Sequence, residues 1–255
     1  MKKIFKKIIL FIQLIQIKVF FKYRYYNLNA DREYNDQLIK KNSLDKNNMI
    51  NVLSLYNYDF YDPKLSFHYS LFAGLSKNKN HKKILEIGTN LGKFTNFVSN
   101  IFPLSTIYTC DLATDDELFD RNFSKDPKAS RENFLHQRNI NLKNKNIIFK
   151  TLNSFDLLKN FEKDYFDIIW VDGDHFNPQV TMDVVSSYYL LKKDGKLICD
   201  DIFIDEKRQY INESEGFEPI NYLTKINKIH TTYFLKRITK YNLIKKKYIS
   251  LSIKI

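Results

Sequence analysis

Two features of the sequence have residue types and a spacing that could bind a ligand. The turn E-I-G-T-N-L-G at 86–92 carries Gly88 and Gly92 four residues apart. Its free amide groups and the positive end of a following helix favour an anionic or carboxylate-bearing ligand. Asp111 comes 19 residues after Gly92 and could accept hydrogen bonds from both hydroxyl groups of a ribose. The turn lacks the G-x-G-x-x-G pattern that suits a pyrophosphate, so we expect a ligand without one.

The elements that must position these residues alternate between strands and helices from residue 82 onward. Short apolar runs typical of buried parallel strands occur at 82–88, 105–112, 146–152, 166–172 and 196–202. Helical patterns lie between them, at 94–101, around 131–140, and from the Asn177 cap with Pro178 in first position to about Leu191, before a Lys-Asp-Gly turn. This alternation predicts an α/β fold with a parallel sheet and helices on both faces.

The two ends of the chain differ from this central pattern. The segments 228–237 and 247–255 are rich in β-branched and aromatic residues, which predicts a closing antiparallel hairpin. We expect three segments in the 255 residues: a basic apolar helix at 1–26, a helical extension at 27–80 and the main domain at 81–255.

The formal net charge of +12 is concentrated at the two ends. Residues 1–24 carry seven Lys or Arg and no acid, and residues 219–255 carry nine and no acid, so the body between them is net acidic. A basic groove for nucleic acid is therefore not favoured, whereas the basic ends could contact an anionic membrane surface. Polar residues interrupt the apolar part of segment 1–26, so we expect a helix that lies on a membrane or a partner. A helix docked on the protein itself and a true anchor are the alternatives.

Several of these segments resemble the class I S-adenosylmethionine-dependent methyltransferases. L-E-I-G-T-N-L-G-K-F-T is similar to the first motif of that family and Y-T-C-D-L to the second, and the resemblance covers residues 65–255. It implies a Rossmann-like doubly wound sheet, which the hairpin would extend to the order 3-2-1-4-5-7-6. It also implies S-adenosylmethionine as the cofactor, and the residues implied to bind or support it are Glu86, Gly88, Thr89, Gly92, Asp111, Asn153, Ser154 and Asp172.

The implied sheet order makes the strands that end in V-D-G-D-H and C-D-D neighbours, about 4.8 Å apart. Their carboxylates would meet at the carboxyl edge of the sheet, where open α/β sheets bind ligands. There the side chains of Asp172, Asp200 and Asp201 would supply oxygen ligands to Mg²⁺, and this resembles the metal-dependent catechol and sugar O-methyltransferases. By the same resemblance, His175 matches a general base, and Asp172 would share the catalytic centre with it.

Other interpretations of these acidic residues stay open at this point. Asp172 could contact only cofactor or substrate, Asp200 and Asp201 could cap a helix, and His175 could face solvent. In the implied order Cys110 and Cys199 would be about 14 Å apart, too far for a disulfide, so we expect free thiols in a reducing compartment.

The expected function is O-methylation of a sugar or glycan hydroxyl in the cytoplasm, with Mg²⁺ assistance. The basic N-terminal helix would allow attachment to the inner face of the membrane, and a homo-oligomer is an open expectation. A nucleic-acid methyltransferase is not favoured, because V-D-G-D-H differs from the Asn/Asp-Pro-Pro-aromatic loop that grips a flipped base. A non-catalytic protein of the same fold, acting at a membrane surface or in assembly, is the alternative function.

Overall fold

The computed structural model describes residues 26–117, 119, 129–204, 215–243 and 246–255, together with residues 16, 20, 23 and 24. The predicted basic helix at 1–26 therefore lies almost entirely outside the described residues. Within the described part of the chain, no helix has both the length and the apolar character needed to cross a membrane.

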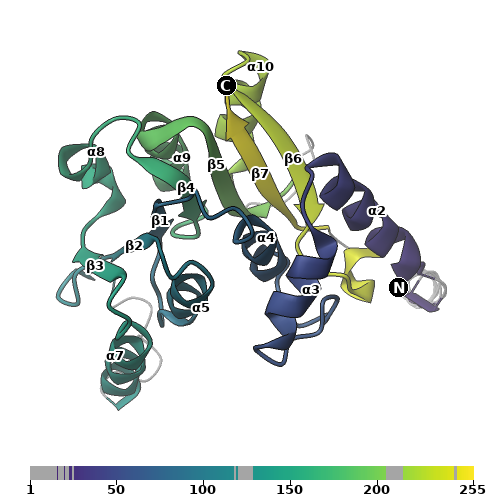
Figure 1. The fold of residues 1–255 in the computed structure, drawn as a ribbon, viewed down its shortest axis with the longest axis horizontal. Helices are drawn as coiled ribbons and strands as arrows, with labels where there is room; N and C mark the ends of the chain where they lie inside the picture. The colour runs from purple at the N-terminus through teal and green to yellow at the C-terminus, as the bar shows by residue number, and fades with distance from the viewer. Residues whose placement is uncertain are drawn as a thin grey trace, which may run out of the picture.

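A mixed sheet in the order β3-β2-β1-β4-β5-β7-β6 forms the centre of the molecule (Figure 1). The parallel strands are β1 (Lys83–Ile87), β2 (Thr106–Asp111), β3 (Ile147–Thr151), β4 (Phe166–Val171) and β5 (Leu191–Ile202). The strands β6 (Ile229–Leu235) and β7 (Tyr248–Lys254) form an antiparallel hairpin, and β7 also pairs antiparallel with β5. The predicted fold class and sheet order are confirmed.

Alternate residues of the central strands enter two separate hydrophobic clusters, one on each face of the sheet. Ile84 and Ile168 pack with α4 (His68–Leu75) and α5 (Lys93–Ile101) on one face. Leu85 and Ile169 pack with the other layer, which contains α8 (Leu157–Asn160), α9 (Gln179–Leu190) and α10 (Phe217–Lys225). Burial on both faces explains why these strands are almost uninterruptedly apolar in the sequence.

Other described elements pack on these helices or connect the strands. The helix α7 (Ala129–Asn141) precedes β3, the short turns η1 (Ser154–Asp156) and η2 (Lys240–Leu243) follow β3 and β6, and α3 (Lys46–Ser54) packs on α4. The cysteines Cys110 and Cys199 are buried free thiols on β2 and β5, with β1 and β4 between them.

Two predicted boundaries were wrong: the start of α9 and the start of β5. Pro178 is the cap residue of α9 instead of its first residue, and the side chain of Asn177 accepts a hydrogen bond from the Thr181 hydroxyl instead of capping the helix backbone. Strand β5 begins at Leu191 and includes the predicted Lys-Asp-Gly turn at 193–195. Phe166 pairs with Leu191 but Ile168 pairs with Lys196, so the turn residues bulge out of a strand that continues on both sides.

Helix α2 (Leu28–Lys41) joins the N-terminal extension to the far edge of the sheet, where Figure 1 shows it beside β6. The fully buried Asn35 makes the connection. Its side-chain oxygen accepts from the Leu235 amide at 2.8 Å, and its side-chain nitrogen donates to the Leu235 carbonyl at 3.1 Å. Asn35 thus satisfies the backbone of an edge strand that would otherwise lack partners.

Candidate active site

A cavity of about 620 Å³ lies at the carboxyl ends of β1, β2 and β4. Five of the residues predicted to bind the cofactor line it: Gly88, Asp111, Asn153, Ser154 and Asp172. Its position is that of ligand sites in open α/β sheets, and its volume is in the range of small-molecule sites. The aromatic side chains of Phe119 and Phe134 also contribute to its wall.

The glycine turn owes its shape to protein packing as well as to ligand access. Gly88 has φ +97°, and a β-carbon there would collide with the carbonyl oxygen of Asp172. Gly92 has φ +69°, and a β-carbon there would lie 2.9 Å from Leu142. Gly88 therefore lets the ends of β1 and β4 approach each other beside the cavity, whereas Gly92 and Thr89 support the turn from outside the cavity lining.

Glu86 is linked to the glycine turn by a network of hydrogen bonds. Its Oε2 accepts hydrogen bonds from the Thr95 hydroxyl at 2.5 Å and from the Thr109 hydroxyl at 2.6 Å. The Thr109 hydroxyl lies 2.7 Å from that of Thr89, so the network reaches the turn itself. Burial raises the pKa of Glu86 to about 7, although the two hydroxyl donors oppose this shift. These contacts connect Glu86 to the turn, and its role in orienting the turn stays a prediction.

Asp111 stands at the end of β2 and faces the cavity. Its Oδ2 accepts from the Asn90 amide and its Oδ1 from the Leu112 amide, both at 2.9 Å. Arg138 of α7, which is 2% exposed, places Nη1 at 3.4 Å from Oδ2. Burial raises the pKa of Asp111, and the amide bonds and Arg138 oppose that rise. Each carboxylate oxygen can accept a further hydrogen bond, as a ribose hydroxyl would require.

The residues after β3 are connected to α9. Asn153 caps η1 by accepting from the Phe155 amide at 3.1 Å. The Ser154 hydroxyl accepts a hydrogen bond from Gln179, which also donates to Asp183 at 3.0 Å. Asp183 is fully buried, and burial raises its pKa to about 6. Sequence reasoning missed both Gln179 and Asp183, because residues inside a helix pattern gave no sign that they line the cavity.

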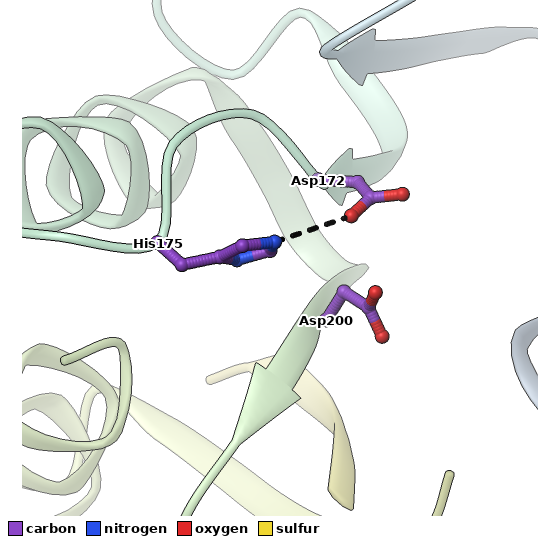
Figure 2. A group of neighbouring side chains, drawn as sticks. All are labelled: Asp172, His175 and Asp200. Atoms are coloured by element: carbon purple, nitrogen blue, oxygen red, sulfur yellow. Dashed lines mark ion pairs between the residues drawn. The ribbon is translucent and has the colours of Figure 1, made fainter. Parts of the chain in front are cut away.

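Asp172, His175 and Asp200 come together beside this cavity (Figure 2). Each offers one ligand or hydrogen-bonding atom, and these atoms all lie within 4.8 Å of one another. His175 Nε2 points at Asp172 Oδ1 from 3.8 Å. Burial, followed by the negative charge of Asp200, raises the pKa of Asp172 well above its usual range. The convergence expected from the neighbouring ends of β4 and β5 is therefore present.

Asp201 belongs to a different arrangement from the one predicted. Lys236 Nζ lies 2.5 Å from Asp200 Oδ2 and 2.5 Å from Asp201 Oδ1, and Lys247 Nζ lies 2.6 Å from Asp201 Oδ2. Although burial raises the pKa of Asp201, the two lysines hold it at about 2. A bulge in β5 between Cys199 and Ile202 places both aspartates opposite one stretch of β7.

The predicted Mg²⁺ ligands can be tested against this geometry. Asp172, Asp200 and Asp201 do not fit one divalent cation as a set, because the Lys236 ammonium already lies between two of the three carboxylates. Asp172 and Asp200 with His175 are a smaller group with the spacing of a cation site, but the Asp200 carboxylate in it is already paired with Lys236. Lys236 was missed because it lies 35 residues beyond Asp201, in a basic end of the chain that was expected to contact an anionic membrane surface.

The sheet order with its antiparallel β7 and the cavity at the carboxyl edge define the class I, Rossmann-like methyltransferase fold. Residues 85–202 match the family described as "Methyltransferase domain", and this match contains the glycine turn, Asp111 and the Asp172 cluster. Residues 85–202 therefore form an S-adenosylmethionine-dependent methyltransferase domain. Its sequence matches none of the curated proteins.

Solved structures support the fold at low sequence identity. A Staphylococcus aureus protein assigned as a caffeoyl-CoA O-methyltransferase is 17% identical, with 89% of this chain and 100% of that chain covered and a TM-score of 0.53. A Klebsiella pneumoniae protein assigned as an O-methyltransferase is 15% identical, with 88% and 99% covered and a TM-score of 0.50. Cofactor-bound Rv0187 from MTB is 12% identical, with 72% and 78% covered and a TM-score of 0.52.

Proposed function

We propose that the protein transfers a methyl group from S-adenosylmethionine to a hydroxyl group of a sugar or glycan. The observation that carries the proposal is the convergence of an imidazole and two carboxylates within 4.8 Å at the edge of the cofactor cavity. Such groups can bind and deprotonate a hydroxyl. The similar structures assigned as O-methyltransferases favour oxygen as the accepting atom.

Different residues of the cavity would contact different parts of the cofactor. Asp111 would bind the ribose hydroxyls, and its contact with Arg138 keeps the carboxylate in place. The Gly88 turn would lie against the methionine part, and Asn153 and Ser154 would lie on the adenine side. When bound, S-adenosylmethionine supplies an electrophilic methyl group.

The residues of the cluster would prepare the acceptor. His175 Nε2 would take the proton of the hydroxyl, and Asp172, at 3.8 Å, would stabilise the resulting imidazolium. Asp200 Oδ1 is buried and accepts no hydrogen bond from the described residues, so it can orient a second hydroxyl. Neighbouring hydroxyl groups on one ring, such as those of a sugar, could use both His175 and Asp200.

Mg²⁺ has no step in this proposal and stays a prediction from the sequence. A cation held by Asp172, His175 and Asp200 would lower the pKa of a bound hydroxyl. Such a cation would also occupy the imidazole that is proposed here to move the proton.

The proposal is tested with labelled S-adenosylmethionine and a panel of sugar, glycan, phenol and amine acceptors. We expect label transfer to sugar hydroxyls. His175→Ala should lower that turnover by about 100-fold or more, because a general base contributes about that much. Affinity for S-adenosylhomocysteine, measured by calorimetry, should stay unchanged.

The matched control is His230→Ala, which alters an exposed histidine on β6. We expect it to leave both turnover and cofactor affinity unchanged. Transfer only to amines would contradict the acceptor class, and full turnover by His175→Ala would contradict the role of the imidazole.

A further inference from the structure

Lys236, directly after β6, has a side chain that is anchored and almost enclosed. Its backbone amide donates to the Lys247 carbonyl at 2.9 Å, and its carbonyl accepts from the Phe67 amide at 2.8 Å. Its side chain is 10% exposed and ends 2.5 Å from both Asp200 and Asp201. The backbone of Lys236 is therefore held by strand pairing on one side and by the N-terminal extension on the other, and the two carboxylates hold its ammonium group.

The positive and negative charges around Lys236 nearly balance one another. Two ammonium groups, of Lys236 and Lys247, face the carboxylates of Asp200 and Asp201. Adjacent buried carboxylates at a strand end need a compensating cation. In this protein the Lys236 ammonium supplies that positive charge. It lies between Asp200 and Asp201, where an ion that bridges both carboxylates would lie.

We propose that Lys236 is a built-in cation that replaces a divalent metal ion at the end of β5. It neutralises Asp200 and Asp201 and occupies Asp200 Oδ2, whereas Asp200 Oδ1 is buried and has no hydrogen-bond partner among the described residues. When the Lys236 ammonium is removed, the carboxylates of Asp172 and Asp200 become free to bind a divalent cation that the natural protein does not bind.

Lys236 is a positioning residue in this proposal, because it acts through Asp200 and does not touch the reacting atoms. The link to methyl transfer rests on the proposed function, since that function makes Asp200 part of the acceptor site. The absence of a divalent-cation site in the natural protein does not depend on the acceptor.

The test titrates MnCl₂ and MgCl₂ separately into the full-length protein saturated with S-adenosylhomocysteine and monitors heat. We expect the natural protein to show no saturable binding up to about 1 mM, the weak end of protein sites for divalent cations. Lys236→Met, which keeps the length of the side chain without its charge, should bind Mn²⁺ at least tenfold more tightly than the natural protein.

Two further variants identify the site. Lys247→Met removes an ammonium that, among the described ion pairs, meets Asp201 but not Asp200, and its side chain is 44% exposed, so this variant should resemble the natural protein. Asp200→Asn combined with Lys236→Met should lose the new Mn²⁺ affinity. Mn²⁺ should also raise the melting temperature of Lys236→Met and leave that of the natural protein unchanged.

Saturable Mn²⁺ or Mg²⁺ binding by the natural protein, at the affinity of Lys236→Met or tighter, would overturn the proposal. If Lys236→Met does not fold, the titration of the natural protein decides by itself: saturable binding overturns the proposal and no binding supports it. Failure of the natural protein to bind S-adenosylhomocysteine would instead count against the proposed function. The cation titration would then be read on the unliganded protein.

Discussion

The free energy of unfolding should depend on pH through Glu86, and Glu86→Gln should remove that dependence. The carboxyl group is buried, and its Oε2 accepts from the hydroxyls of Thr95 and Thr109. Burial raises its pKa to about 7 from an ordinary value of 4.5. A glutamine is nearly the same shape, and its oxygen can accept both hydroxyl hydrogen bonds.

The magnitude follows from the difference between the folded and unfolded pKa values. The folded protein retains the proton of Glu86 between about pH 4.5 and pH 7, where the unfolded chain loses it. Stability therefore falls as the pH rises through this window and is constant above it. At 1.36 kcal/mol per pKa unit, the loss is about 3 kcal/mol. Glu86→Gln should avoid the loss, so its advantage over the natural protein should grow to about 3 kcal/mol above pH 7.

The assay is urea unfolding of both proteins at several values between about pH 5 and pH 8. The exposed Glu33→Gln variant on α2 serves as the control and should keep the pH dependence of the natural protein. Equal pH dependence in Glu86→Gln and the natural protein would refute the reasoning. It would show that the buried carboxyl does not titrate in this window.

Three other substitutions test the site and the fold. Asp111→Asn should weaken S-adenosylhomocysteine binding by about tenfold, because a hydrogen bond to a charged group is lost; unchanged affinity by calorimetry would exclude the ribose contact. Gly88→Ala should lower both the melting temperature and cofactor affinity, because the new methyl group would collide with the Asp172 carbonyl; a variant with natural stability would contradict that packing. Asn35→Ala should lower the free energy of unfolding by about 2 kcal/mol, because the backbone of Leu235 loses both partners; denaturant unfolding without a shift would show that water replaces the side chain.

Much of the fold was predictable because strand and helix periodicities are local properties. The apolar runs identified β1 to β5, since strands covered on both faces need continuous apolar sequence. The β-branched and aromatic residues near the end of the chain correctly predicted the β6–β7 hairpin. The boundary of β5 was not predictable in the same way, because Lys-Asp-Gly at 193–195 has turn chemistry and forms a bulge only when β4 lies beside it.

The candidate site was predictable where strand order alone brings residues together. Asp172 and Asp200 end adjacent parallel strands, so the sheet order is enough to place them at one edge. Asp111 follows from the same rule on the other side of β1. Asp201 was assigned to the same group, but the bulge in β5 and the hairpin lysines give it other partners.

The amino-acid pattern by itself thus determined the strands and the acids that their ends carry, and the family resemblance implied the order of the strands in the sheet. Only the tertiary structure decided which cations meet those acids: Arg138 reaches Asp111 from 27 residues away, and Lys236 reaches Asp200 from 36 residues away. Periodicity is set by neighbours in the sequence and can be read from it. An ion pair between distant residues forms only after packing brings two segments of the chain together. A local sequence pattern therefore does not predict it.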